Sequence, residues 1–321
     1  MPQGRHTNVI TSCTQSKRLT APDALHGGNL DREAPVEERC SDWCARLQAA
    51  SEPTVAARDL YKGDHWQVSL EIGATAPQGH SCRLWVASAG HGLIDVDRPI
   101  HSYAATFRTD QEDSVVRSAT EARAWWTGLT VDARARSTEP SSLEALVAED
   151  PAAGLIVVAS PSYINALEAD LSAAIRLMSD ASRAIIVSAG KPRKASTLSP
   201  QWLSFDARIR TIVGGGMQGL NARVARFLCQ SAGPWPLTVE AAQACLDEAC
   251  HSIERFRYPS RDGQSDAALT EFIEEELRTD SRVTKTGLLR KLRSMGLACE
   301  QKRFGALFNQ VKHQSHGQAE I

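Results

Sequence analysis

The sequence predicts an α/β protein in which a mostly parallel, doubly wound sheet precedes a C-terminal helical module of helix-turn-helix or winged-helix type. Short, uninterrupted, β-branched runs alternate with segments of helical periodicity, as in sheets whose strands are buried on both faces. The apolar periodicity then breaks, and a compact basic segment with helical spacing follows it. We therefore expect an α/β domain at residues 1–256, a linker at 257–264 and a basic trihelical module at 265–321.

Five short apolar runs account for the predicted strands, and each ends in small or polar residues. These runs are residues 9–13, 84–90, 155–160, 184–190 and 211–216. The predicted helices are residues 58–72, 118–129, 163–178 and 220–229, with a shorter helix at 37–50 inside the polar stretch 15–53. Residues 132–142 are expected to form a loop.

Composition limits the classes of function. The balance of 42% hydrophobic and 23% charged residues over 321 positions is that of a globular protein with room for two domains. A formal net charge of -2 argues against a protein that coats nucleic acid over its whole surface, so a polyanion site must be a local patch. The first residues lack an apolar signal region and no run approaches the ~20 apolar residues of a membrane span. We expect a cytoplasmic protein with no membrane contact.

The eight cysteines are scattered without a Cys-x2-Cys pair. In a chain that is not exported, this pattern indicates reduced thiols rather than a disulfide framework. No two ligand pairs stand at zinc-finger or ribbon spacing, so we predict no metal site. The sequence identifies no cofactor.

Serine and glycine mark the carboxyl ends of all five predicted strands. At any one strand end these are simply common turn residues, but five such ends together favour a ligand pocket at that edge of the sheet. The segment 214–221 is expected to lead from a strand into a helix, an arrangement that can cradle a phosphate or a base. The predicted ligand-binding residues are Ser12, Tyr61, Ser88, Ser160, Ser162, Tyr163, Ser188, Lys191, Gly215, Gln218 and Asn221.

The candidate catalytic residues lie in two segments that follow predicted strands. Cys13 precedes Lys17, and a nearby lysine can lower the pKa of a thiol and so favour the nucleophilic thiolate. The alternative is that Cys13 fills the core while Lys17 binds a phosphate or carboxylate. His91 could act as an acid or base, or it could serve the backbone conformation between two glycines. Tyr103 follows in the next loop as a polar contact.

Several familiar hydrolase motifs do not occur in the sequence. It contains no Walker lysine, no Gly-x-Ser-x-Gly elbow and no His-Glu-x-x-His pair. P-loop hydrolysis, serine-hydrolase chemistry and zincin chemistry are therefore disfavoured.

The C-terminal segment has three stretches of helical periodicity. Apolar residues from Ala267 to Leu277 form the first, residues 286–295 form the second and stop at Gly296, and the third begins near Glu300. From Arg278 onward nearly all charges are positive, which suits contact with phosphates. The predicted nucleic-acid-binding residues are Arg290, Lys291, Arg293, Gln301, Lys302 and Arg303. The alternative is a trihelical bundle that dimerises or binds a partner protein.

Four short blocks occur in order along residues 8–110 and carry a family resemblance. They are Ser-Cys-Thr with Lys17, Ala-x-x-Leu-Tyr ending at Tyr61, Val-Ala-Ser-Ala-Gly-His-Gly-Leu-Ile around Ser88 and Gly92, and Ile-x-x-Tyr ending at Tyr103. The chain here resembles bacterial and phage proteins of unknown function related to the YaaA-type peroxide-stress family and to 7-deazaguanine DNA-modification proteins. Two features depart from the usual strings: the Ser-Cys order is reversed, and His91 replaces another residue.

The resemblance implies work on DNA. YaaA-type proteins bind DNA and are tied to oxidative damage, and relatives occur in gene clusters that place 7-deazaguanine bases in DNA. One such relative is assigned the conversion of the nitrile of DNA-borne 7-cyano-7-deazaguanine to the amide. Three hypotheses follow for this chain. It is a hydrolase or lyase acting on a modified or damaged base or nucleotide in DNA, a non-catalytic DNA-binding stress or phage-defence protein, or a subunit that docks onto a partner enzyme of a modification or defence system.

Overall fold

The computed structural model describes residues 6–194, 196–231, 233, 235–254, 262–280 and 282–317. The chain divides into two compact units, Met1–Glu254 and Arg255–Ile321, which we call the α/β unit and the C-terminal module. Within the linker predicted at 257–264, residues 257–261 lie outside the described part of the chain, and Asp262–Gly263 form a short strand, β8.

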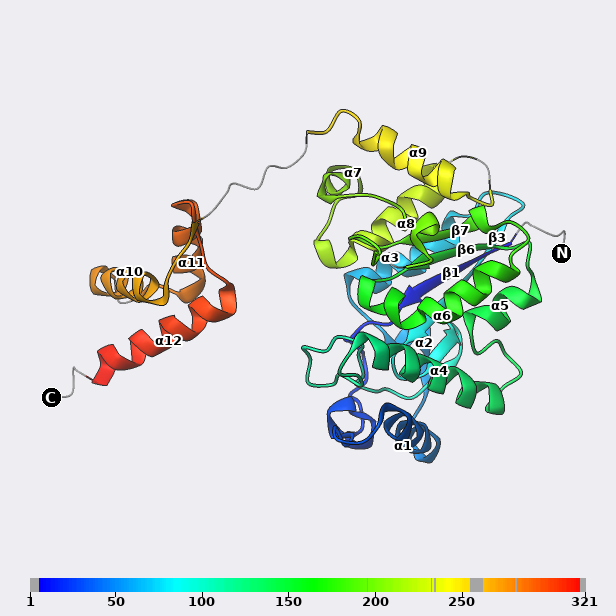
Figure 1. The fold of residues 1–321 in the computed structure, drawn as a ribbon, viewed down its shortest axis with the longest axis horizontal. Helices are drawn as coiled ribbons and strands as arrows, with labels where there is room; N and C mark the ends of the chain where they lie inside the picture. Colours follow the sequence, from blue (N-terminus) through cyan, green and yellow to red (C-terminus); the bar gives the residue numbers. More distant parts are fainter. Residues whose placement is uncertain are drawn as a thin grey trace. The chain divides into compact units, whose positions relative to one another are not determined.

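A five-stranded sheet forms the centre of the α/β unit (Figure 1). Its strands are β1 (His6–Ser12), β3 (Ser81–Ser88), β4 (Gly92–Asp95), β6 (Gly154–Val158) and β7 (Ala184–Val187). Their order is β4-β3-β1-β6-β7, and all neighbours are parallel except β3 and β4. The α/β prediction with a mostly parallel sheet is thus confirmed, and the sheet is mixed because β4 returns beside β3 as a hairpin.

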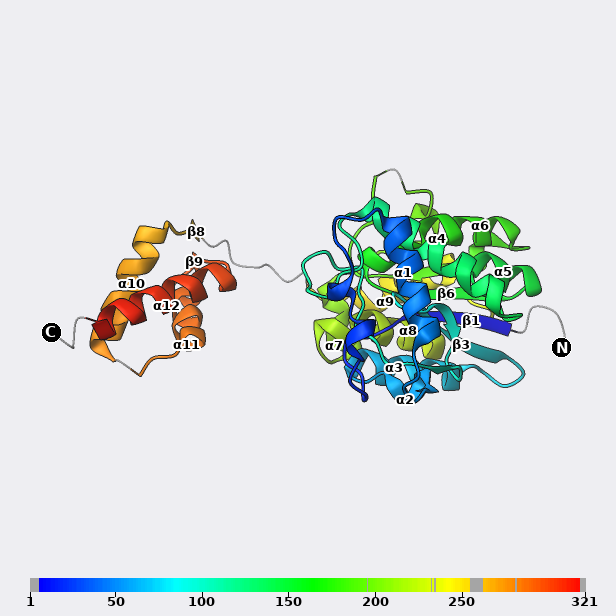
Figure 2. The ribbon, with the colours of Figure 1, turned by 90° about the horizontal axis from the view of Figure 1, so that it is seen from below.

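Helices cover both faces of this sheet, with α3 and α8 on one side and α4, α5 and α6 on the other (Figures 1 and 2). The helices of the unit are α1 (Val36–Ala49), α2 (Ala57–Leu60), α3 (Asp64–Ile72), α4 (Ala119–Arg136), α5 (Leu143–Glu149), α6 (Pro161–Leu177), α7 (Arg210–Val213), α8 (Leu220–Ser231) and α9 (Val239–Cys250). A two-residue strand β2 (Val55–Ala56) pairs with β5 (Pro99–Ile100) outside the main sheet. No helix in the described ranges combines the length and apolar character needed to cross a membrane.

The strand predicted at 211–216 was wrong. Arg210–Val213 instead form a single helical turn, and Gly214 and Gly215 follow with positive φ angles of 69° and 72°. The apolar run is too short for its periodicity to separate strand from helix, and Ile212 is 45% exposed, whereas an inner strand needs both faces covered. The glycine-rich segment therefore joins two helical elements rather than a strand and a helix.

Two further boundaries differ from the prediction. The helix expected at 58–72 is broken between α2 and α3, because Gly63 adopts a φ of 102° that interrupts helical geometry. The loop expected at 132–142 is shorter, since α4 continues to Arg136.

Two buried tryptophans fix the turn between β3 and β4. Trp43 of α1 donates its indole N–H to the carbonyl of Gly90 at 2.7 Å, and Trp125 of α4 donates to the carbonyl of Ala89 at 2.8 Å. Both rings are completely buried. Paired buried donors of this kind satisfy carbonyls that would otherwise be costly to bury, so the helices hold the turn in one position.

The C-terminal module contains three helices around its own apolar core. Its elements are β8 (Asp262–Gly263), α10 (Asp266–Thr279), α11 (Lys285–Ser294), β9 (Leu297–Ala298) and α12 (Gln301–Gly317). The core includes Ile273, Leu292 and Phe304, one from each helix. Ser265 and Thr284 cap the first two helices with their hydroxyl oxygens. Each helix bound that was predicted here lies within two residues of the observed one.

A substitution at Gly90 tests the close packing of this turn between β3 and β4. A Cβ at Gly90 would lie 2.5 Å from Cδ2 of the buried Tyr103 ring, so Gly90→Ala should reduce the free energy of unfolding by about 1–3 kcal/mol. Gly73→Ala is the matched control, because a Cβ at Gly73 would meet no atom within 4 Å and the backbone there is helical. Urea unfolding measures both, and equal stabilities for the two variants would contradict this packing.

Candidate functional site

A small pocket of about 210 Å³ opens at the carboxyl ends of β1 and β6. From β1 the chain continues to β3 on one side and later reaches β6 on the other. The strand order thus reverses between β1 and β6, the place where open α/β sheets bind ligands. The residues that line the pocket are Ser12, Cys13, Gln15, His65, Ala105, Thr106, Arg108, Ser160, Tyr163, Gln218 and Asn221.

Cys13 lies directly after β1 and faces Tyr163 of α6. The two side chains form a hydrogen bond of 3.0 Å between the sulfur and the phenol oxygen, and the backbone N–H of Cys13 donates to the carbonyl of Ala87 on β3. Burial raises the pKa of Tyr163 well above its usual range, and the neighbouring Cys13 adds to the rise. Tyr163 therefore keeps its proton, and its hydroxyl can donate to a Cys13 thiolate.

A chain of buried hydroxyls lies next to this pair. The Tyr103 hydroxyl is 2.8 Å from the Tyr61 hydroxyl and 2.7 Å from Oγ of Ser88. Oγ of Ser88 also accepts the backbone N–H groups of Gly90 and His91. Burial raises the pKa of both Tyr61 and Tyr103, and Cys13 contributes in each case. These phenols act as hydrogen-bond donors rather than as bases.

Lys17 completes the cluster as a partly buried cation over aromatic rings. Its Nζ lies 4.1 Å from the centre of the Tyr103 ring and 5.6 Å from that of Tyr61, and it donates to the carbonyl of Thr14 at 3.1 Å. Burial lowers the pKa of Lys17, and the charges of Cys13 and Asp113 partly offset this. The cation is thus placed to stabilise negative charge beside Cys13.

His91 lies behind Tyr103, outside the residues that line the pocket. Its ring meets the Tyr103 ring edge-on at a centroid distance of 4.9 Å, and Nε2 lies 3.1 Å from the His101 carbonyl. Because a carbonyl only accepts, Nε2 carries the hydrogen. Burial lowers the pKa of His91 to about 3. The ring is consequently neutral at pH 7 and packs edge-on against the Tyr103 ring.

Two other predicted ligand-binding residues, Asn221 and Ser160, line the pocket. Asn221 spans two strand ends, since its amide donates to the Ala159 carbonyl at 2.9 Å and its oxygen accepts the Ala189 N–H at 2.8 Å. Ser160 lines the pocket and is 2.9 Å from Ser162 through their hydroxyl oxygens.

Six of the predicted ligand-binding residues do not line the pocket, namely Tyr61, Ser88, Ser162, Ser188, Lys191 and Gly215. Ser188 is completely buried, and its hydroxyl has no hydrogen-bond partner among the described residues. Lys191 and Gly215 are exposed. Gln218, also exposed, does line the pocket.

Sequence reasoning missed His65, Thr106 and Arg108. His65 occupies the first turn of α3, directly after the turn at Gly63, and its Nε2 lies 3.1 Å from Oγ1 of Thr11 and 3.5 Å from Oγ of Ser12. Thr106 and Arg108 come from the loop after Tyr103. Only the glycine break before α3 could have drawn attention to His65, because a single histidine in a helical pattern carries no chemical signature.

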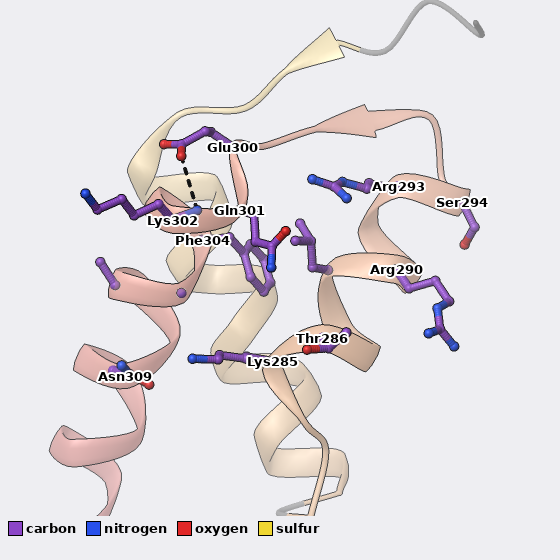
Figure 3. Close-up of a pocket in the computed structure, with 13 residues that line it drawn as sticks. Lys285, Thr286, Arg290, Arg293, Ser294, Glu300, Gln301, Lys302, Phe304 and Asn309 are labelled. Carbon is purple, nitrogen blue, oxygen red and sulfur yellow. Dashed lines mark hydrogen bonds between the residues drawn. The ribbon is translucent and has the colours of Figure 1, made fainter. Parts of the chain in front are cut away.

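A larger groove of about 930 Å³ lies in the C-terminal module between α11 and α12. Figure 3 shows Lys285 extending from α11 toward α12, and Gln301 lying over Phe304. The lining residues are Lys285, Thr286, Leu289, Arg290, Arg293, Ser294, Glu300, Gln301, Lys302, Phe304, Gly305, Ala306 and Asn309. The cations along the groove can contact phosphates, and apolar groups lie between them.

The six predicted nucleic-acid-binding residues do not all share this groove. Arg290, Arg293, Gln301 and Lys302 line it. Lys291 pairs with Glu276 at 2.6 Å, and Arg303 donates to Asp266 at 2.7 Å. Lys291 and Arg303 thus join α11 and α12, respectively, to the acidic helix α10.

The described residues contain no group of three or more histidine, cysteine, aspartate or glutamate side chains suited to hold a metal ion. None of the eight cysteines, all of which lie in the described ranges, forms a disulfide. Comparisons of the chain with protein-family models, curated proteins and solved structures gave no match. The resemblance noted in the sequence therefore stays a prediction.

The lowered pKa of His91 can be tested through the pH dependence of stability. Its folded value of about 3 lies below the ordinary 6.5, so below pH 6.5 the unfolded chain binds this proton and the folded chain does not. Stability should fall as the pH drops from about 6.5 toward 3. His91→Gln keeps a donor for the His101 carbonyl but cannot titrate. Urea unfolding across this range should therefore show a smaller fall in the free energy of unfolding for the variant than for the wild-type protein. Parallel curves for the two proteins would contradict the assignment.

Proposed function

We propose that the chain is an enzyme that acts on a modified or damaged base in DNA, with the base in the strand-end pocket and Cys13 as the nucleophile. The hydrogen bond between Cys13 and Tyr163 at the point of strand-order reversal carries this proposal. The pocket, at about 210 Å³, is smaller than the ~300–1,000 Å³ of drug-sized ligand sites. A single heterocycle suits that space better than a complete nucleotide.

The chemistry suits an electrophilic carbon on the base, and the nitrile of 7-cyano-7-deazaguanine is the substrate that we propose. The Cys13 sulfur adds to the nitrile carbon while the nitrile nitrogen takes up a proton, which gives a thioimidate. Water then adds to the same carbon, the carbon–sulfur bond breaks, and the product is the carboxamide with the thiol restored. The Lys17 charge, which interacts with Cys13, and the Tyr163 hydroxyl, which bonds to its sulfur, can stabilise negative charge that develops there.

The C-terminal module serves this function by holding the DNA. We propose that it works as a helix-turn-helix or winged-helix unit, with α12 entering a groove of the duplex and Arg290 and Lys302 contacting phosphates. The two short strands β8 and β9 pair beside these helices. Exposed cations on a surface of this size supply affinity that depends little on sequence.

One observation favours the second candidate, a DNA-binding stress or phage-defence protein without catalysis. Cys13 is only 8% exposed, so its side chain could pack in the core while the polar residues that line the pocket recognise a base without reacting with it. Turnover by the wild-type protein separates the two candidates, because recognition alone leaves the base unchanged.

Replacement of Cys13 tests the nucleophile. Cys13→Ala should abolish turnover of an oligonucleotide that carries 7-cyano-7-deazaguanine, because no thioimidate can form, while duplex affinity stays at the wild-type level. Cys245 is a half-buried cysteine of α9 that does not line the pocket, so Cys245→Ala is the matched control and should turn over normally. Mass analysis of the oligonucleotide measures both. Undiminished turnover by Cys13→Ala would remove this residue from the mechanism.

Substitutions of two neighbouring cations in α11 test whether the groove contacts DNA phosphates. Arg290 is exposed and lines the groove, whereas Lys291 is tied to Glu276. Arg290→Ala should weaken duplex binding and lower the slope of log affinity against log salt by about 0.9, the value for one lost phosphate contact. Lys291→Ala should change the slope much less. Fluorescence anisotropy at several salt concentrations provides the measurement, and the reverse ranking would place the DNA on another face of the module.

A further inference from the structure

His65 is the pocket residue whose chemistry the proposed function leaves unused. Besides Cys13, the titratable side chains that line the pocket are His65, Arg108 and Tyr163. Arg108 pairs with Asp110 and keeps its charge, and burial keeps Tyr163 protonated by raising its pKa. Histidine is the side chain whose ordinary pKa lies near neutral pH. His65 is therefore a lining residue suited to take up and release a proton.

Hydroxyl groups of β1 and α3 fix the His65 ring. Nε2 lies 3.1 Å from Oγ1 of Thr11 and 3.5 Å from Oγ of Ser12, the residue before Cys13. The Ser69 hydroxyl lies 2.9 Å from that of Thr11 and also donates to the His65 carbonyl at 2.9 Å. Hydroxyl groups rather than a carboxylate thus hold the ring at the end of β1.

An ion pair ties the helix that carries His65 to α8, the helix that supplies Asn221 to the pocket. Asp64, the preceding residue, pairs with Arg223 of α8. A Cβ at Gly219 would overlap both of these side chains, so the absence of a side chain there lets the pair form. The short 3-10 helix Met217–Gly219 also carries Gln218, which lines the pocket. His65 and Gln218 are consequently held by one set of contacts.

We propose that His65 is the general base that activates the water which resolves the Cys13-bound intermediate. This inference rests on the proposed function. As the water oxygen bonds to the carbon attached to sulfur, one water proton passes to the ring nitrogen of His65. The carbon–sulfur bond then breaks, and the Cys13 sulfur takes the proton back. Burial lowers the pKa of His65, although a hydrogen bond to the Ser12 backbone and the Asp64 charge oppose this, so the ring is neutral and able to accept a proton at pH 7.

Intact-protein mass spectrometry of the full-length His65→Gln variant tests the assignment. The variant is mixed with an oligonucleotide that carries 7-cyano-7-deazaguanine. Glutamine can bond to the Thr11 and Ser12 hydroxyls but cannot accept a proton, so the Cys13 adduct should accumulate while product formation falls by about 10²–10⁴-fold. His80→Gln is the matched control. His80 is a part-buried histidine that bonds to the Trp235 carbonyl at 3.1 Å and precedes β3 at the other edge of the sheet, so its variant should turn over normally without an adduct.

The remaining outcomes separate this inference from the proposed function. Product formation by His65→Gln at the wild-type rate would overturn the role of His65 and leave Cys13 in place. A folded His65→Gln variant with neither adduct nor product would also overturn it, because His65 would then act in the first step. Absence of product from the wild-type protein would remove both proposals. Imidazole added to His65→Ala should restore turnover, and failure of this rescue in a folded variant would count against a base at this position.

Discussion

The buried hydroxyl of Tyr103 is the interaction on which the site depends most. It bonds to Tyr61 at 2.8 Å and to Ser88 at 2.7 Å, while the Tyr103 ring carries the Lys17 ammonium at 4.1 Å. Four chain segments that are distant in sequence thus meet at one phenol. A buried hydroxyl that loses its partner costs about 1–3 kcal/mol, so each segment constrains the others. Cys13 lies at the border between this rigid network and the pocket, where a thiol can be oriented without being enclosed on every side.

The fold was predictable where burial controls the pattern. Strands β1, β3, β6 and β7 overlap the β-branched apolar runs from which they were predicted, and most of their residues are buried. Two elements escaped prediction because their form depends on tertiary contacts. β4 is only four residues long and exists through its pairing with β3. Residues 210–213 have the composition of a strand, yet none of the described strands pairs with them and they coil into the turn α7.

The site was predictable where its residues follow strands directly. Ser12, Cys13 and Ser160 could be placed at one sheet edge because parallel strands bring their carboxyl ends together. Tyr163 follows from the same reasoning, since it stands in the first turn of α6. His65 could not be found in this way. It reaches the pocket through the packing of α3 against α8 and the ion pair between Asp64 and Arg223, and neither contact leaves a local sequence signal.

The C-terminal module illustrates the same limit for charge. Six polar and basic residues were predicted to bind nucleic acid, but Lys291 and Arg303 pair with carboxylates of α10. The acidic character of α10 was visible in the sequence, while its contact with these two cations required the three-dimensional arrangement. The groove between α11 and α12 retains Arg290, Arg293 and Lys302.

Nucleoside mass analysis of DNA from cells with and without the protein tests the central claim most directly. If Cys13 acts on a nitrile-bearing base, cells with the protein should contain a nucleoside heavier than its precursor by one water. Cells that express Cys13→Ala should match those without the protein. Identical nucleoside profiles in all three cultures, with the precursor base present, would contradict the account.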